Sequence, residues 1–296
     1  MTLQTILQTI LSNAHLAGIL VLATTGIMLV FRTSFTTNFA QGMMATVGIF
    51  TTVALTDKMG LNIWLGVALG IVLSFFLGLF IDVAIIRKAK NVSIVGKQMI
   101  TMGLVIIISA LIPLIYGTIP FEFGRFIEGN FDFAIGNMDL YITKNGLLIL
   151  GVAAVIVTII FISLYFTKWG IGVRATASNE TVASMMGINT RVITAMSWSL
   201  AGGCGAVAAI LMASQSGTVE NTMMVSVQVN GFMASVLGGF SSFYGPIIGA
   251  LLIPISKAVI AIYNSLWSGV ILYSAILLVV LIKPRGLFGK KYVKKV

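Results

Sequence analysis

Long runs of apolar residues, separated by short polar stretches, recur along the whole chain. The runs lie at residues 14–31, 39–55, 62–86, 99–117, 145–167, 191–212, 224–240, 245–263 and 267–283. They are continuously apolar and do not alternate every second residue, which predicts helices and not the strands of a barrel. Because about 20 apolar residues cross the hydrocarbon of a bilayer as a helix, we expect an all-α polytopic membrane protein with eight or nine transmembrane helices.

The second and seventh runs, residues 39–55 and 224–240, are short and interrupted by glycine. We expect these two segments to be broken or re-entrant helices, which are tolerated where protein or a water-filled cavity covers the freed backbone. Runs one to four and six to nine form two groups, and an offset of five crossings makes the groups run in opposite directions. Inverted repeats with interrupted helices at corresponding positions recur in transporters. The pattern therefore predicts an inverted repeat.

The composition excludes an ordinary soluble domain. Of the 296 residues, 58% are hydrophobic and 9% are charged, whereas soluble domains carry about 25% charged residues. A surface in contact with lipid needs few charges, and a surface in contact with water cannot be built from so few. We therefore expect residues 1–296 to form a single transmembrane domain.

The charged residues predict how the chain is oriented. Lys and Arg gather in cytoplasmic loops, so the net charge of +10 needs no nucleic-acid partner to explain it. With nine crossings, the predicted cytoplasmic side holds 14 of the 18 basic residues, namely Arg32, Arg87, Lys88, Lys90, Lys97, Lys168, Arg174, Arg191, Lys283, Arg285, Lys290, Lys291, Lys294 and Lys295. We expect a multi-pass protein of the inner membrane, with the N-terminus outside and the C-terminus in the cytoplasm.

The loop at residues 118–144 is the largest element predicted outside the membrane. It carries several phenylalanines among acidic residues, which is too apolar for a disordered linker. Two interpretations stay open. The loop is an ordered cap against which an external partner docks, or it folds onto the ends of the helices.

The sequence shows no signature of an enzyme. It contains no G-x-x-x-x-G-K-[ST] phosphate loop, so nucleotide hydrolysis is not expected in this chain. The one histidine, His15, has no acidic or cysteine neighbour at the spacing of metal ligands. We expect no catalytic residue, no metal site and no cofactor within the chain.

Two charged residues fall inside predicted membrane segments. Intramembrane acids are typical of ion-coupled transport, and Asp82 is the one acid in such a position. It lies about one turn from Arg87, which favours an ion pair at the end of a helix. Lys257 lies near the outer end of its segment, where its long stem either reaches the lipid headgroups or places the amine at the mouth of a pathway.

The predicted cytoplasmic loop at residues 168–191 is long for a connection between two helices. From Asn179 to Met186 it has the pattern of a short amphipathic helix, which Gly187 closes because glycine tolerates a positive φ. An apolar face in the cytoplasm is costly unless something covers it. A groove on another protein is the expected cover, and the bilayer surface is the alternative.

This loop carries a resemblance to a known family. Its run Gly-x-Arg-Ala-x-Ala-x-Asn-Glu, followed by Ala-x-x-x-Gly-Ile-Asn, resembles the coupling loop of the branched-chain amino acid permeases of bacterial ABC importers, a family that includes ribose, nucleoside and short-chain amide permeases. Three further stretches resemble the family in order and spacing: residues 38–42 (Asn-Phe-Ala-Gln-Gly), 237–249 (Gly-Gly-Phe, then Gly-Pro and Gly) and 283–289 (Lys-Pro-Arg-Gly-Leu-Phe-Gly).

The resemblance implies a set of partners. In such importers an external solute-binding protein delivers the solute, two membrane subunits form the pathway, and two cytosolic ATPases bind ATP and Mg. The second membrane subunit is either another copy of this chain or a related protein. The short loop helix is implied to insert into a cleft of the ATPase. The residues that match the family's coupling loop are Arg174, Asn179, Glu180, Ala183 and Gly187.

Polar amides within the second and seventh segments are candidates for the translocation pathway. They are Asn38, Gln41, Gln228 and Asn230. Such amides either line the pathway or form hydrogen bonds between helices. The chain has Gln41 where the family commonly has histidine, and Met43 and Met44 follow where an acid is common. The resemblance favours a branched-chain or other amino acid as the solute, whereas these departures from the family pattern make a nucleoside, a sugar or an amide a comparable alternative.

Glycines are frequent in the sixth, seventh and eighth segments, where they permit close approach of helices in lipid. The glycines expected at packed interfaces are Gly202, Gly203, Gly238, Gly239 and Gly245. An ion-coupled secondary transporter is the competing hypothesis from a different class. Transport that persists without an ATPase and collapses with the ion gradient would favour it.

Overall fold

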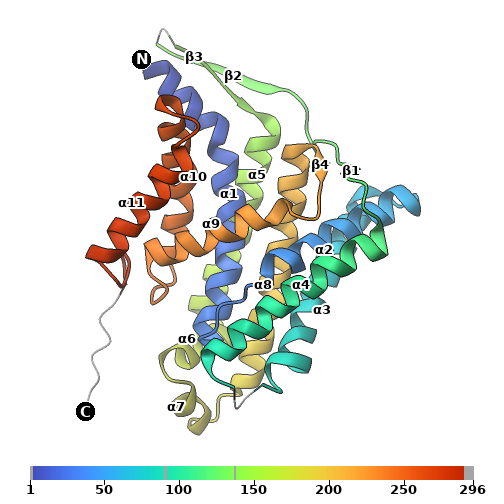
Figure 1. Ribbon diagram of the computed structural model, residues 1–296, viewed down its shortest axis with the longest axis vertical. Helices are drawn as coiled ribbons and strands as arrows, with labels where there is room; N and C mark the ends of the chain where they lie inside the picture. The colour runs from blue at the N-terminus through green and yellow to red at the C-terminus, as the bar shows by residue number, and fades with distance from the viewer. Residues whose placement is uncertain (1–2, 90–91, 137, 290–296) are drawn as a thin grey trace.

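The computed structural model describes residues 3–89, 92–136 and 138–289, and Figure 1 shows the arrangement of its helices. The helices are α1 (Leu3–Ser34), α2 (Gln41–Val53), α3 (Ile63–Phe80), α4 (Ile94–Tyr116), α5 (Lys144–Phe166), α6 (Lys168–Ser178), α7 (Glu180–Met185), α8 (Thr190–Ser216), α9 (Met223–Gly238), α10 (Gly245–Tyr263) and α11 (Ser268–Ile282). Two π-helical turns, η1 (Ala54–Lys58) and η2 (Ile81–Ile86), continue α2 and α3. Each of the nine predicted hydrophobic runs overlaps one of the longer helices.

Within the described residues, six helices are long and apolar enough to cross a membrane. They are α1, α3 with η2, α4, α5, α8 and α10. Helices α9 and α11 are apolar but shorter, with 16 and 15 residues, and α2 has 13. The molecule is therefore a mostly helical, polytopic membrane protein, as the sequence predicts.

Helices α1 and α8 form the centre of the molecule and pack against each other. Every residue of α1 from Ala17 to Val30 is buried, which is unusual for a helix that crosses lipid at the surface of a bundle. Helix α1 also packs against α10, and α8 packs against α3. By contrast, α4 and α5 remain largely exposed in the chain and carry the apolar surface available to lipid or to another subunit.

The short helices α2 and α9 lie across the direction of the central pair α1 and α8 (Figure 1). Helix α2 packs against α3 and α8, and α9 packs against α10 and α1. The two short helices also contact each other. The second and seventh segments therefore meet inside the bundle. Each is a continuous short helix and not a broken one, and a re-entrant course through the membrane stays a prediction.

A stripe of small residues on α3 allows the central helices to approach closely. Gly66, Gly70, Ser74 and Gly78 are buried at intervals of four residues. A methyl group at Gly78 would overlap the backbone carbonyl of Trp198 on α8. Close backbone contact of this kind increases van der Waals packing, which drives helix association in lipid.

The loop at residues 118–144 is ordered at one end of the bundle, which we call the hairpin end. Strands β2 (Asn130–Ile135) and β3 (Met138–Thr143) form an antiparallel hairpin, and β1 (Phe121–Glu122) pairs with β4 (Thr218–Val219). The Gln8 side chain accepts a hydrogen bond from the backbone N of Tyr141 and donates one to its carbonyl, both at 3.0 Å. The loop is thus folded onto the helix ends, and a role in docking a partner stays a prediction.

Helices α6 and α7 lie at the opposite end, which we call the α7 end (Figure 1). The sequence predicted α7 but not α6. Thr167 begins α6, because its hydroxyl accepts a hydrogen bond from the backbone N of Gly170 at 3.1 Å. Gly170 has no side chain to clash with the carbonyl of Leu164, so α6 folds back tightly against the end of α5.

Candidate functional site

Helix α7 spans Glu180–Met185, one residue inside each end of the predicted helix from Asn179 to Met186. The Asn179 side-chain oxygen accepts a hydrogen bond from the backbone N of Val182 at 3.1 Å, which caps the first turn. At the other end Gly187 has φ +83°, and the backbone N of Ile188 donates to the carbonyl of Ala183 at 3.0 Å. A left-handed glycine with such a bond is a common way to end a helix.

The two faces of α7 differ sharply in exposure. Val182, Met185 and Met186 are 52%, 80% and 78% exposed, and Glu180 is exposed beside them. Ala183 is 3% exposed and packs against its own chain. The exposed surface of α7 therefore includes an apolar part formed by these three side chains, beside the exposed polar residues Thr181 and Ser184.

Two of the five predicted coupling residues face inward. Besides Ala183, Arg174 lies on α6 with its guanidinium carbon 5.3 Å from the centre of the Tyr165 ring, a cation–π contact with α5. Both residues hold α6 and α7 against the bundle. The exposed positions Asn179, Glu180 and Gly187 remain available to a partner.

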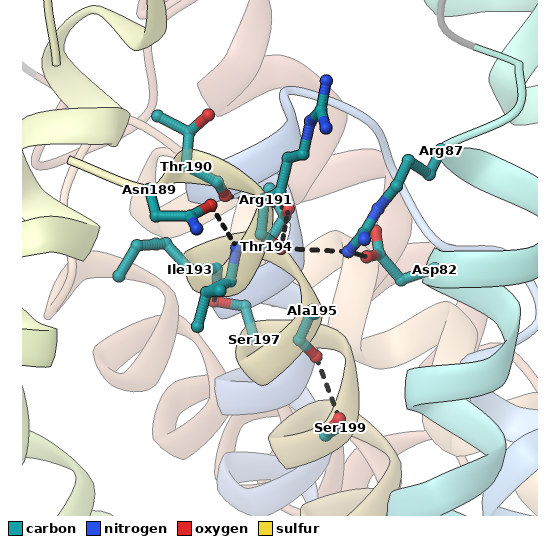
Figure 2. A network of polar contacts seen from close by, with 11 residues as sticks. Asp82, Arg87, Asn189, Thr190, Arg191, Ile193, Thr194, Ala195, Ser197 and Ser199 are labelled. Atoms are coloured by element: carbon teal, nitrogen blue, oxygen red, sulfur yellow. Dashed lines mark hydrogen bonds and ion pairs between the residues drawn. The ribbon is translucent and has the colours of Figure 1, made fainter. Parts of the chain in front are cut away.

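A polar network links the end of α3 to the start of α8, directly after the α7 loop. Figure 2 shows Arg87 between Asp82 and the backbone of Arg191. The Arg87 Nη2 atom lies 3.0 Å from Asp82 Oδ2 and 3.1 Å from the Arg191 carbonyl oxygen. Asp82 is buried at 3% exposure. The helix-end ion pair that the sequence favoured for Asp82 is therefore present.

A cavity of about 560 Å³ opens beside this network, and we call it the inner cavity. Asp82, Arg87 and Arg191 line it on one side, and Glu180 and Met185 of α7 line it on the other. Movement of α7 therefore changes the surroundings of the ion pair directly.

The amides of the two short helices form cross-links inside the bundle. The Gln228 Oε1 atom accepts a hydrogen bond from the backbone N of Gly42 at 2.6 Å, and its Nε2 atom donates to the Phe39 carbonyl. Gln41 donates to the carbonyls of Ala23 on α1, at 3.1 Å, and Ala201 on α8, at 3.5 Å. Three helices thus converge on the start of α2.

The predicted pathway residues separate into two groups. Asn38, which accepts a hydrogen bond from the backbone N of Ala40 at 3.0 Å, is fully buried, and Gln41 is 2% exposed. Gln41 Oε1 has no hydrogen-bond partner among the described residues. Asn230 instead faces a cavity of about 610 Å³ at the hairpin end, which we call the outer cavity. Its Oδ1 atom accepts a hydrogen bond from Tyr273 at 2.8 Å.

The outer cavity lies between α1, α9 and α10 and is lined by four further polar residues, Thr9, Asn13, Ser226 and Lys257. The sequence offered a place at the mouth of a pathway for Lys257, because it is charged within an apolar segment, and gave no signal for the other three. The outer cavity and the inner cavity lie at opposite ends of the bundle.

The predicted glycines mark close backbone contacts, with one exception. A methyl group at Gly238 would overlap the Gly245 carbonyl, and one at Gly245 would overlap the Gly238 carbonyl. A methyl group at Gly202 would overlap the carbonyl of Ser74 on α3. At Gly203 it would lie 3.7 Å from a ring carbon of Phe75, an ordinary contact distance, so the interface has room there.

The C-terminal motif at residues 283–289 caps α9. The backbone N of Leu287 donates to the Leu237 carbonyl at 2.8 Å, and that of Phe288 donates to the Gly238 carbonyl at 3.1 Å. Gly239 has φ +93°, and a methyl group there would crowd the Arg285 carbonyl and the Gly289 backbone. The terminal motif and the glycine turn are therefore two halves of one structural unit.

Comparison with known proteins gives consistent matches over almost the whole chain. A family model described as the permease component of branched-chain amino acid transport systems matches residues 9–281. The chain is 27% identical to the probable branched-chain amino acid transport permease protein LivH of Methanocaldococcus jannaschii, over 94% of this chain and 91% of that protein. It is also 27% identical to the high-affinity permease protein LivH of Escherichia coli K12, over 98% and 97%, and 24% identical to BraD of Pseudomonas aeruginosa, over 88% of each.

Proposed function

Since this chain belongs to the branched-chain amino acid permease family, we propose that it forms half of the pathway by which an ABC importer moves a small amino acid across the membrane. The chain is a multi-pass membrane permease component. ATP and Mg are assigned to a cytosolic ATPase partner, and delivery of the solute is assigned to an external binding protein.

The observation that carries the proposal is the outward face of α7. An apolar face formed by Val182, Met185 and Met186 is exposed at the α7 end. Basic residues lie at the same end: Arg87 and Arg191 line the inner cavity, and α6 begins at Lys168. Methionine side chains adapt their shape to a partner surface, and a short helix with such a face fits a hydrophobic groove. We assign this face, with Glu180, to a groove of the ATPase.

The basic residues near α7 support a cytoplasmic position for this end of the molecule. The hairpin end carries acidic residues and is assigned to the outside, with the N-terminus. They are Glu122, Glu128, Asp132, Asp139 and Glu220. The external binding protein then meets the hairpin and the first turns of α1.

The packing of the helices supports an inverted repeat in which α1, α2 and α3 correspond to α8, α9 and α10. Helix α1 packs against α10 as α8 packs against α3, and α2 packs against α3 as α9 packs against α10. In this arrangement α2 and α9 are the paired short helices near the centre of the membrane. A change in their mutual packing is the simplest way to open a path between the outer and inner cavities.

Similarity to three proteins named as branched-chain amino acid permeases supports an aliphatic amino acid as the solute. The largely exposed helices α4 and α5 provide apolar surface for a second membrane subunit. That subunit is another copy of this chain or a related permease.

The test is uptake into liposomes that contain the chain, a second permease subunit, the ATPase and the binding protein. We expect ATP-dependent uptake of radiolabelled leucine, isoleucine or valine that stops when the ATPase is omitted. Uptake that continues without the ATPase and follows an ion gradient would contradict the importer assignment. ATP-dependent uptake of a sugar or nucleoside, with none of an amino acid, would contradict the assigned solute only.

A further inference from the structure

The outer cavity combines one cation with apolar walls and no acid. Lys257 lines the cavity, and none of the residues that line it is acidic. Within the described part of the chain, the amine of Lys257 has no ion pair and no hydrogen bond. An ammonium group on an apolar helix is costly unless an anion or water reaches it. Lys257 is exposed, so its amine is accessible to an anionic group that enters the cavity.

The walls beside Lys257 fit an aliphatic group. Leu20 of α1, Val227 of α9 and Ile253 of α10 are 4%, 8% and 1% exposed, so they present fixed apolar surface and not mobile side chains. The cavity of about 610 Å³ is within the range of small-molecule sites, which hold about 300–1,000 Å³. Its walls and its cation together match a molecule with an aliphatic part and an anionic part.

A polar acceptor faces the same cavity from α1. The Asn13 Nδ2 atom donates to the Thr9 carbonyl at 2.8 Å, which leaves Asn13 Oδ1 without a partner among the described residues. An amide oxygen accepts hydrogen bonds from an ammonium group. Asn230 adds an amide from α9, held in place by Tyr273.

We propose that the outer cavity is a binding site for the zwitterionic amino acid, in which Lys257 pairs with the carboxylate and Asn13 accepts a hydrogen bond from the ammonium group. The aliphatic side chain then lies against Leu20, Val227 and Ile253. This inference rests on the proposed function and adds a site within the membrane subunit that selects for the carboxylate. The site lies at the hairpin end, so it receives the solute before the short helices move.

Replacement of Lys257 tests the site. In the reconstituted importer, Lys257→Met is expected to raise the isoleucine concentration for half-maximal uptake about 10-fold or more, because the carboxylate loses its charge-assisted hydrogen bond. Lys257→Arg keeps the charge and is expected to retain most of the uptake. Lys58→Met is the matched control, because Lys58 lies at the same end and donates to the Tyr116 carbonyl at 3.2 Å. It is expected to leave uptake unchanged.

Binding to the permease alone gives a second measurement that does not depend on the ATPase. Saturation-transfer difference NMR in lipid nanodiscs is expected to detect isoleucine bound to the unaltered chain and to Lys257→Arg, but not to Lys257→Met. Isoleucinamide, which lacks the carboxylate, is expected not to bind the unaltered chain. A melting temperature close to that of the unaltered chain shows that Lys257→Met is folded.

Three results would overturn the inference. One is equal uptake and equal binding by Lys257→Met and the unaltered chain, which leaves the importer function intact. Another is equal binding of isoleucine and isoleucinamide. The last is that a phospholipid co-purifies with the unaltered chain, is not displaced by isoleucine and is absent from Lys257→Met. That result would show that Lys257 binds a lipid headgroup and not the amino acid. Failure of ATP-dependent uptake by the unaltered chain would instead contradict the proposed function itself.

Discussion

The Oε1 atom of Gln228 lies 2.6 Å from the backbone N of Gly42, so one side chain of α9 is hydrogen-bonded to the first turn of α2. The same amide donates to the Phe39 carbonyl, just before α2 begins. The Gly42 N–H has no partner within α2, because the first turn of a helix leaves its N–H groups unsatisfied. Gln228 therefore supplies the cap that the sequence of α2 lacks, and it joins the two short helices.

Replacement of Gln228 by leucine is expected to destabilise the permease. The change leaves the Gly42 N–H and the Phe39 carbonyl without partners in an apolar environment, at a cost of about 1–3 kcal/mol for each group. The melting temperature in detergent should fall, and Asn230→Leu should have a smaller effect because Asn230 bonds a side chain at a cavity edge. Equal melting temperatures for Gln228→Leu and the unaltered chain would contradict the capping role.

The Gly238–Gly245 contact gives a second prediction, with Gly203 as its control. Gly238→Ala places a methyl group against the Gly245 carbonyl, and relief of the overlap requires α9 and α10 to separate, at about 1–3 kcal/mol or more. Gly203→Ala has room beside Phe75 and is expected to be neutral or slightly stabilising, since alanine favours the helix. The yield of folded protein and its melting temperature distinguish the two. A drop for both variants would show that the difference in space does not matter.

Substitutions at Gly187 and Gly217 distinguish an effect of backbone strain from an effect on the coupling of ATP hydrolysis to uptake. Both glycines have left-handed backbones, with φ +83° and +80°, and neither has an atom near the position of a Cβ. Valine at either position is expected to cost about 1–2 kcal/mol in backbone strain. Gly187→Val, beside α7, should uncouple ATP hydrolysis from uptake, whereas Gly217→Val, at the hairpin end, should lower stability alone. Normal solute-stimulated hydrolysis in Gly187→Val would count against α7 as the coupling element.

The Arg87 bridge gives a fourth prediction. Removal of Arg87 leaves the buried carboxylate of Asp82 unpaired and frees the Arg191 carbonyl. Arg87 is partly exposed, with 36% of its side-chain surface accessible. We therefore expect Arg87→Met to lower the free energy of unfolding by about 1–3 kcal/mol, which is less than the loss expected when a fully buried ion pair is broken. In a double-mutant cycle, adding Asp82→Asn should recover part of the loss. Strictly additive losses would show that the two side chains do not interact in the membrane.

Much of the fold follows from the sequence because long apolar runs leave the backbone no alternative to a helix in lipid. Helix α7 follows from two local signals, the cap at Asn179 and the left-handed position of Gly187. Helix α6 was missed because Gly170 and Gly172 lower helix propensity. Its stability comes from packing, with Val173 and Ala177 fully buried against the bundle.

The candidate site was less predictable than the fold. The amide of Gln41 signals contact with protein or water, but sequence does not show that its partners are the carbonyls of Ala23 and Ala201. Nor does the pattern of a six-residue helix show that Ala183 faces inward. The four-residue spacing of small residues on α3 was present in the sequence and would have identified its buried face.

Cross-linking from α7 tests the central claim most directly. Cys204, the chain's one cysteine, is buried at 5% exposure, so a new cysteine on α7 dominates the reaction with a cross-linker that has one thiol-reactive end and one photoreactive end. Met185→Cys, at a position 80% exposed, is expected to cross-link to the ATPase in the assembled importer, and Ala183→Cys, at 3%, is expected not to. Capture of lipid alone by Met185→Cys with every ATPase candidate present, or equal capture of the ATPase from both positions, would contradict the account.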